Sequence, residues 1–106
     1  MVRREAIARV GPMDERFFMF NEDVDWCRRM KLAGWAVAYV PEGRVIHHIG
    51  ASRGKVAAKV IVERHRCMIH YFHKHHPGNP VVTLLADALI VLRAGLMLTA
   101  NALRPR

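Results

Sequence analysis

The chain has 106 residues, which suits a single domain and is short for an enzyme that holds two substrates in one cleft. A hydrophobic fraction of 52% excludes intrinsic disorder, and two cysteines without CxxC or zinc spacing exclude a disulfide scaffold as the main source of stability. Seventeen Lys and Arg against nine Asp and Glu give a net charge of +8, which favours phosphates or anionic surfaces as partners.

The charge is unevenly spread along the chain. Residues 1–27 hold six acids and four bases, whereas residues 28–106 hold three acids and thirteen bases. The tightest acidic cluster is Glu22, Asp23 and Asp25. Because neighbouring carboxylates repel one another, we expect a metal, a helix N-terminus or nearby arginines to stabilise this cluster.

The first half of the chain predicts two helices. Residues 4–10 form the first, which the Gly-Pro pair that follows brings to an end. Residues 13–20 show no clear period and are expected to pack their phenylalanines irregularly into a core. A second helix begins at Asn21 or Glu22, with Asn21 as N-cap, and ends at Gly34.

The second half predicts two short strands and two longer helices. Residues 35–40 and 44–48 have the composition of strands, and a basic loop follows at 51–55. A helix is expected over residues 56–75 and an apolar helical segment over 80–103. The predicted fold class is therefore α+β: helices with two short strands, then a long helix and a C-terminal apolar amphipathic helix.

Three interpretations of the expected helix over residues 80–103 remain open. On a helical wheel, its polar residues fall within an arc of about 120°, which makes the segment amphipathic with a wide apolar face. These residues are Thr83, Asp87, Arg93, Asn101 and Arg104, and only Thr99 lies opposite. Two charges within the run disfavour a membrane span. A membrane surface, a docking partner and ordinary core packing all remain consistent with this pattern.

Several motifs occur in a fixed order over residues 2–75. They are RREA from residue 3, DERFF from 14, NEDVDWCRR from 21, AGW from 33, YVP from 39 and VIHHIGAS from 45. Together they resemble the C-terminal portion of family 2 glycosyltransferases of the GT-A fold, the rhamnosyltransferase-like branch in particular.

The resemblance implies an activity and an architecture. It implies inverting transfer of a hexosyl group from a nucleotide-diphosphate donor to a glycan or lipid-linked acceptor hydroxyl, with Mg²⁺ or Mn²⁺, in cell-surface polysaccharide synthesis. The fold would then be a partial α/β GT-A lobe, with a catalytic and acceptor portion at 1–79 and a helical tail at 80–106. The donor-binding half that precedes this portion in the family is absent, so activity of these residues alone is not expected. The expected location is the cytoplasm, at the inner face of the cytoplasmic membrane.

The resemblance also assigns roles within the acidic motif. The second acid of the Glu-Asp pair, Asp23, maps to the base that takes the proton of the acceptor hydroxyl. Glu22 and Trp26 are assigned to acceptor binding, and Asn21 and Asp25 to the helix start. Asp23 and Asp25 spell D-x-D, but they stand at a helix start and not in the nucleotide-binding half, so we do not interpret them as the family's metal motif.

A second group of assigned residues follows the predicted strands. In the family, a histidine in the context of VIHHIGAS completes the metal and diphosphate site, which maps to His47. Ser52, Arg53 and Lys55 would form a basic loop over the diphosphate.

Two other classes of protein compete with the glycosyltransferase interpretation. The basic charge of residues 28–106 is compatible with a small nucleic-acid-binding protein, although no RRM, KH or zinc-finger signature supports it and the acidic cluster opposes it. The apolar segment 80–103 is compatible with a membrane-peripheral interaction module.

Overall fold

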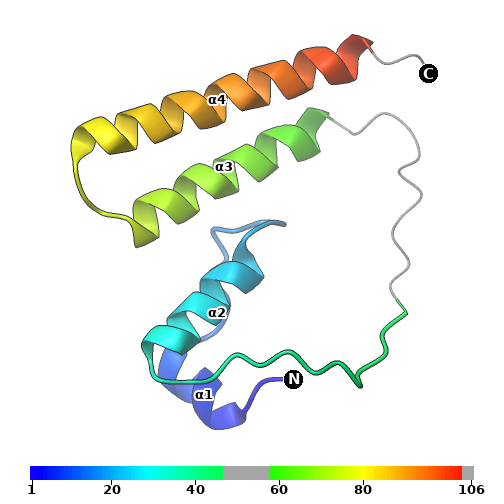
Figure 1. The fold of residues 1–106 in the computed structure, drawn as a ribbon, viewed down its shortest axis with the longest axis vertical. Coiled ribbons are helices and arrows are strands. Elements are labelled where there is room, and N and C mark those ends of the chain that lie inside the picture. The colour runs from blue at the N-terminus through cyan, green and yellow to red at the C-terminus, as the bar shows by residue number, and fades with distance from the viewer. Residues whose placement is uncertain (47–57, 104–106) are drawn as a thin grey trace.

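The computed structural model describes residues 1–46 and 58–103, and within these ranges the chain forms four helices and no strand (Figure 1). The helices are α1 (Arg4–Val10), α2 (Glu22–Leu32), α3 (Ala58–His75) and α4 (Pro80–Leu103). Their bounds agree closely with the four helices expected from the sequence, because each begins or ends at a local signal such as Gly11, Asn21 or Pro80.

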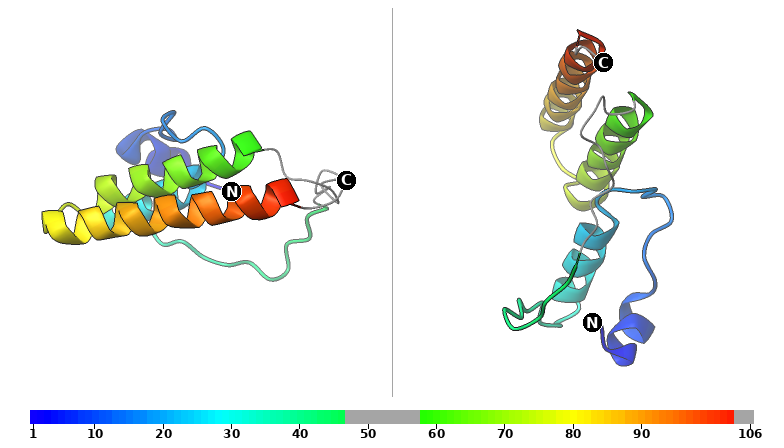
Figure 2. Two further views of the ribbon diagram at one scale, coloured as in Figure 1. Left: turned by 90° about the horizontal axis from the view of Figure 1, so that it is seen from above. Right: turned by 90° about the vertical axis from the view of Figure 1, so that its right-hand side faces the viewer.

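Helix α3 is the middle layer of the molecule (Figures 1 and 2). On one side it runs antiparallel to α4, to which it is joined by a short connection. On the other side it contacts the irregular segment 13–20 and the start of α2. There the buried Phe17 ring meets the His70 ring edge-on at 4.7 Å, and Arg64 lies over the Phe20 ring at 5.4 Å. The expectation that phenylalanines of this segment pack inward holds for Phe17, whereas Phe18 is exposed.

Helices α1 and α2 are joined at the Gly11 turn. Gly11 has φ 84°, a left-handed conformation that glycine adopts without a Cβ clash, and its N–H caps α1 by donating to Ile7 O at 2.7 Å. The Trp26 indole N–H of α2 donates to Gly11 O at 2.9 Å. Asn21 occupies the N-cap position of α2 but makes no side-chain cap bond: its backbone is left-handed at φ 67°, outside the usual N-cap conformation, and its Nδ2 donates to Cys67 O at 3.5 Å.

The core enclosed by the described residues is small. Its buried apolar members are Ala6, Phe17, Met30, Ile61 and Cys67. Large apolar side chains lie instead on the surface, above all along residues 37–46 and along α4. These two regions therefore gain little of the burial energy that normally stabilises a fold.

The α+β prediction is wrong for the described residues, because the segment from Trp35 to Ile46 forms no strand. A strand needs a neighbouring strand to pair its backbone N–H and C=O groups, and residues 1–46 and 58–103 provide none beside this segment. Its backbone makes local turn bonds instead, from Trp35 N to Met30 O and from Gly43 N to Val40 O. The composition favoured a strand, but the pairing that would stabilise one is missing. The last two positions of the second expected strand, His47 and His48, lie outside the described residues.

Candidate active site

The first turn of α2 holds three acids that lie in different surroundings. Glu22, Asp23 and Asp25 all lie there, at the positive end of the helix dipole. Successive residues of a helix turn by about 100°, so Asp23 and Asp25 project roughly 160° apart. One is exposed and the other is fully buried, which separates two carboxylates that are two positions apart in sequence.

Asp25 is 0% exposed and is surrounded by cations. Its Oδ2 accepts from Arg29 Nε at 2.8 Å, one turn along the same helix. Its Oδ1 lies 2.8 Å from Lys74 Nζ and 2.6 Å from His75 Nε2, both at the end of α3. Burial by itself would raise the pKa of Asp25, but the hydrogen bonds from Lys74, His75 and Arg29 outweigh it and hold the pKa below its ordinary value. The Asp25 carboxylate is therefore ionised, its charge is balanced by its neighbours, and it is inaccessible to solvent.

Asp14 extends this cluster toward the irregular segment. Its side chain accepts from Arg16 Nη2 at 2.8 Å and from Lys74 Nζ at 2.7 Å, so Lys74 bridges Asp14 and Asp25. Hydrogen bonds from Arg16 first, and then from Lys74, hold the pKa of Asp14 far below its ordinary value. Arg29 also donates to Val10 O at 2.8 Å. The cluster therefore ties together the end of α1, the segment after it, α2 and the end of α3.

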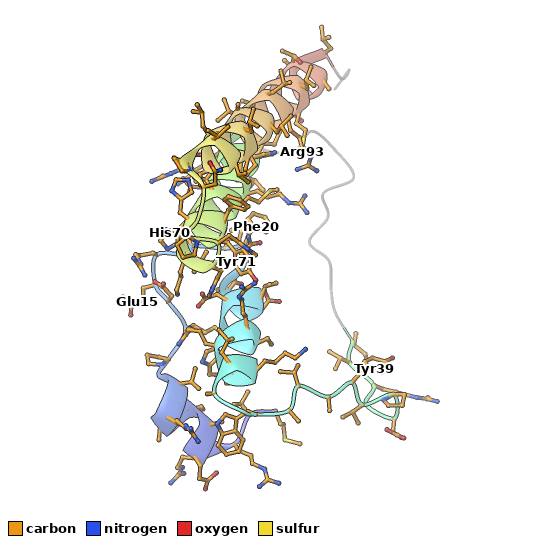
Figure 3. All side chains as sticks on the ribbon, turned by 60° about the vertical axis from the view of Figure 1, so that its left-hand side comes forward. Glu15, Phe20, Tyr39, His70, Tyr71 and Arg93 are labelled. Carbon is orange, nitrogen blue, oxygen red and sulfur yellow. The ribbon has the colours of Figure 1, made fainter. Side chains whose placement is uncertain are left out.

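Asp23 has none of these partners. Its Oδ1 accepts only the local N–H of Val24 at 2.8 Å, and the side chain is exposed. It lines an open groove of about 530 Å³ between α2 and the end of α3. The other lining residues are Val24, Cys27, Arg28, Lys31, Leu32 and Tyr71. Figure 3 shows Tyr71 where α3 meets the start of α2. An accessible carboxylate thus stands in a groove with two cations and one aromatic ring.

The two residues assigned to acceptor binding lie in different places. Glu22 has a buried Oε2 with no hydrogen-bond partner among the described residues, and it is not among the residues that line the groove. The indole N–H of Trp26 is already bonded to Gly11 O, and Trp26 is not among the residues that line the groove. Trp26 therefore holds α1 against α2 in this structure.

The residues assigned to the metal and the diphosphate, His47, Ser52, Arg53 and Lys55, lie outside the described residues. Over residues 1–46 and 58–103, no group of three His, Cys, Asp or Glu side chains is placed to hold a metal ion. The described part of the chain does not by itself form a site for a divalent cation.

Sequence reasoning missed several residues that the structure brings to this region. Cys27 and Lys31 follow Asp23 at i+4 and i+8, so helical periodicity alone could have placed them on its face. Nothing local indicates Tyr71 at the groove, nor Lys74 and His75 at Asp25. Those contacts depend on how α3 packs against α2.

Three characterised proteins are similar in sequence to this chain. No family model and no solved structure matches the chain. N-acetylglucosaminyl-diphospho-decaprenol L-rhamnosyltransferase of Mycobacterium tuberculosis is 37% identical over 109 residues, which cover 100% of this chain and 35% of that protein. Rhamnosyltransferase WbbL of Escherichia coli K12 is 42% identical over 48 residues, 45% of this chain and 18% of that protein. The dTDP-rhamnosyl transferase RfbF of Shigella flexneri is 36% identical over 56 residues, 53% of this chain and 19% of that protein.

The chain is therefore homologous to glycosyltransferases, which confirms the resemblance found in its motifs. Within that class its relatives are rhamnosyltransferases. The chain spans about a third of the length of the curated relative that it matches throughout.

Proposed function

We propose that this chain is the portion of an inverting rhamnosyltransferase that binds the acceptor and removes the proton from its attacking hydroxyl. The homology supports the class of reaction. The observation that carries the assignment within the chain is the divergence of Asp23 and Asp25: one carboxylate is open to a ligand, and the other is saturated by Arg29, Lys74 and His75.

A general base must reach the proton that it takes and must have a free lone pair. Asp23 satisfies both conditions, because its side chain is exposed at the groove and only one of its oxygens is used, by Val24 N. Its carboxylate would accept the hydroxyl proton as the oxygen attacks the anomeric carbon, opposite the departing nucleoside diphosphate. Attack from that face inverts the anomeric centre.

The walls of the groove suit a phosphorylated, sugar-bearing acceptor. Arg28 and Lys31 supply charged N–H donors, and Tyr71 supplies an aromatic surface on which a sugar can lie. The matched Mycobacterium tuberculosis protein acts on a sugar-diphospho-decaprenol, which combines these groups. We propose an acceptor of this class, with Glu22 as a further hydrogen-bond acceptor for its hydroxyls once its carboxylate turns out of its buried position toward the groove.

The donor is proposed to be a nucleotide-activated rhamnose, as the printed name of RfbF indicates for that protein. Its nucleotide would bind to the larger part of a rhamnosyltransferase, which this chain does not cover. Ser52, Arg53 and Lys55 are proposed to contact the donor diphosphate, and His47 to ligate a divalent ion there. That ion would offset the charge of the leaving group.

A chimaera tests the proposal. The segment of the Mycobacterium tuberculosis rhamnosyltransferase that aligns with this chain is replaced by this chain, and transfer from dTDP-rhamnose to N-acetylglucosaminyl-diphospho-decaprenol is measured. Loss of a general base lowers rates by about 10²–10⁴-fold, so Asp23→Asn should reduce kcat by that amount with little change in donor affinity. Glu15→Gln, an exposed acid outside the groove, is the matched control and should leave kcat unchanged. An Asp23→Asn chimaera that retains full kcat contradicts the assignment.

A further inference from the structure

Helix α4 presents its polar side chains to α3 and its apolar side chains outward. Asp87 Oδ2 lies 2.9 Å from His73 Nε2, and Arg93 Nη1 lies 3.2 Å from His65 Nε2. The other ring nitrogen of His65 lies 2.6 Å from Ile61 O, which can only accept, so Nδ1 carries the proton and Nε2 is free to accept from Arg93. Helices at the surface of water-soluble proteins have the opposite arrangement, with the apolar stripe toward the core.

The outward face of α4 is apolar along the whole helix. It is formed by Val81, Val82, Leu84, Leu85, Leu89, Val91, Leu92, Leu96 and Leu103, each more than half exposed. Leu84 and Leu89 are 70% and 67% exposed. The hydroxyl of Thr99, which shares this face, donates to Leu96 O at 2.9 Å. The outward face therefore offers no unsatisfied polar side chain to an apolar surrounding.

This face is too large to be an incidental patch. A helix of 24 residues is about 36 Å long. In the most apolar 18-residue stretch of α4, 0% of the residues are buried. By length and composition α4 could cross a membrane. Soluble monomers rarely expose a continuous apolar surface of this extent, so the face is expected to be covered in the functional state.

The packing of α3 decides how a membrane could cover it. Lys59, Arg64 and Arg66 of α3 are exposed, and α3 runs along the polar side of α4. A transmembrane α4 would carry these charges into the hydrocarbon, where each unpaired charge is strongly disfavoured. With α4 parallel to the surface, the same charges stay in water while the apolar face is buried.

The charge of the hairpin favours anionic lipid. Residues 58–103 hold five Lys and Arg and two acids. One of the acids, Asp87, lies against His73, and the other, Glu63, lies 3.2 Å from Arg66. Lys74 is paired with Asp14 and Asp25, but the four other bases still outnumber these two acids, so the hairpin carries a net positive charge that attracts anionic headgroups.

We propose that α4 lies in the plane of an anionic bilayer surface with its outward apolar face in the acyl boundary and α3 on the aqueous side. This inference goes beyond the proposed function and does not depend on it, because vesicle binding is measured without sugar transfer.

The first experiment measures binding of the chain to phosphatidylcholine vesicles with and without phosphatidylglycerol. The chain should float with the anionic vesicles and much less with neutral ones. Leu89→Gln/Leu92→Gln should weaken binding by about a hundredfold, since two large apolar side chains lose their burial. Val45→Gln/Ile46→Gln, which alters two apolar residues outside α4 that are even more exposed than Leu89 and Leu92, should bind as the parent does. Equal losses in both double variants contradict the proposal.

A second measurement determines orientation and excludes other occupants. In the variant Leu89→Trp, brominated lipid should quench the fluorescence of the introduced indole. In Val62→Trp, whose introduced indole lies at an exposed position of α3, the fluorescence of that indole should not be quenched. Quenching of both would indicate insertion of the hairpin and overturn the proposal. A stable dimer that buries position 89 and ignores vesicles would overturn it as well.

Discussion

The Nε2 atom of His75 lies 2.6 Å from Oδ1 of Asp25, so the last residue of α3 donates a hydrogen bond to a carboxylate in the first turn of α2. Lys74 reaches the same oxygen at 2.8 Å. These contacts join parts of the chain that are about 50 positions apart. Because the described core is small, this polar cluster is a main connection between α2 and the end of α3.

Asp25→Asn should destabilise the fold strongly. The amide keeps the shape of the side chain but loses the charge that Arg29 and Lys74 face, and breaking one partner of a buried ion pair costs about 3–5 kcal/mol. Chemical denaturation followed by circular dichroism measures the free energy of unfolding. The control Glu15→Gln is exposed and should change this value by less than about 0.5 kcal/mol. A similar small effect for Asp25→Asn would show that the cluster contributes little.

The same cluster predicts how stability depends on pH. Folding lowers the pKa values of Asp14 and Asp25, whereas an Asp in the unfolded chain has a pKa of about 3.9. Their contribution is therefore present above about pH 5, and it is lost as the pH falls toward the lowered folded pKa values, where the unfolded chain binds more protons. Unfolding free energies measured from pH 7 downward should decrease with acid. The decrease should be shallower in Asp14→Asn and in Asp25→Asn, and an unchanged slope in both would contradict this origin.

Trp26→Phe tests the assignment of Trp26 to packing. The change removes the hydrogen bond to Gly11 O but keeps an aromatic ring, and we expect a loss of about 0.5–1.5 kcal/mol. Amide exchange should accelerate most in α1, which this bond holds against α2. In the chimaera described above, the variant should keep its affinity for the acceptor. A selective rise in KM for the acceptor would instead return Trp26 to acceptor binding.

The helices could be predicted because their signals are local. The Gly-Pro pair after Val10, the acids in the first turn of α2 and Pro80 at the start of α4 act within one helical turn. The strands could not be predicted reliably, because composition does not report whether a pairing partner is present. Val45 and Ile46 have ideal strand side chains, yet they are 87% and 85% exposed, and the part of the chain that the structure describes holds no strand to pair with them.

The assignments within the acidic motif depend on the sequence motifs and on the tertiary structure together. The ordered motifs of residues 2–75 by themselves identified the glycosyltransferase resemblance, and the wheel of residues 80–103 showed a polar and an apolar side. The resemblance assigned Asp23 and Asp25 different roles, and only the tertiary structure showed the physical difference between them, since Lys74 and His75 of α3 both contact the buried Asp25. Likewise, only the packing of α3 showed that the polar side of α4 faces inward. Periodicity determines which residues share a face, but contacts between distant segments decide which way that face is turned.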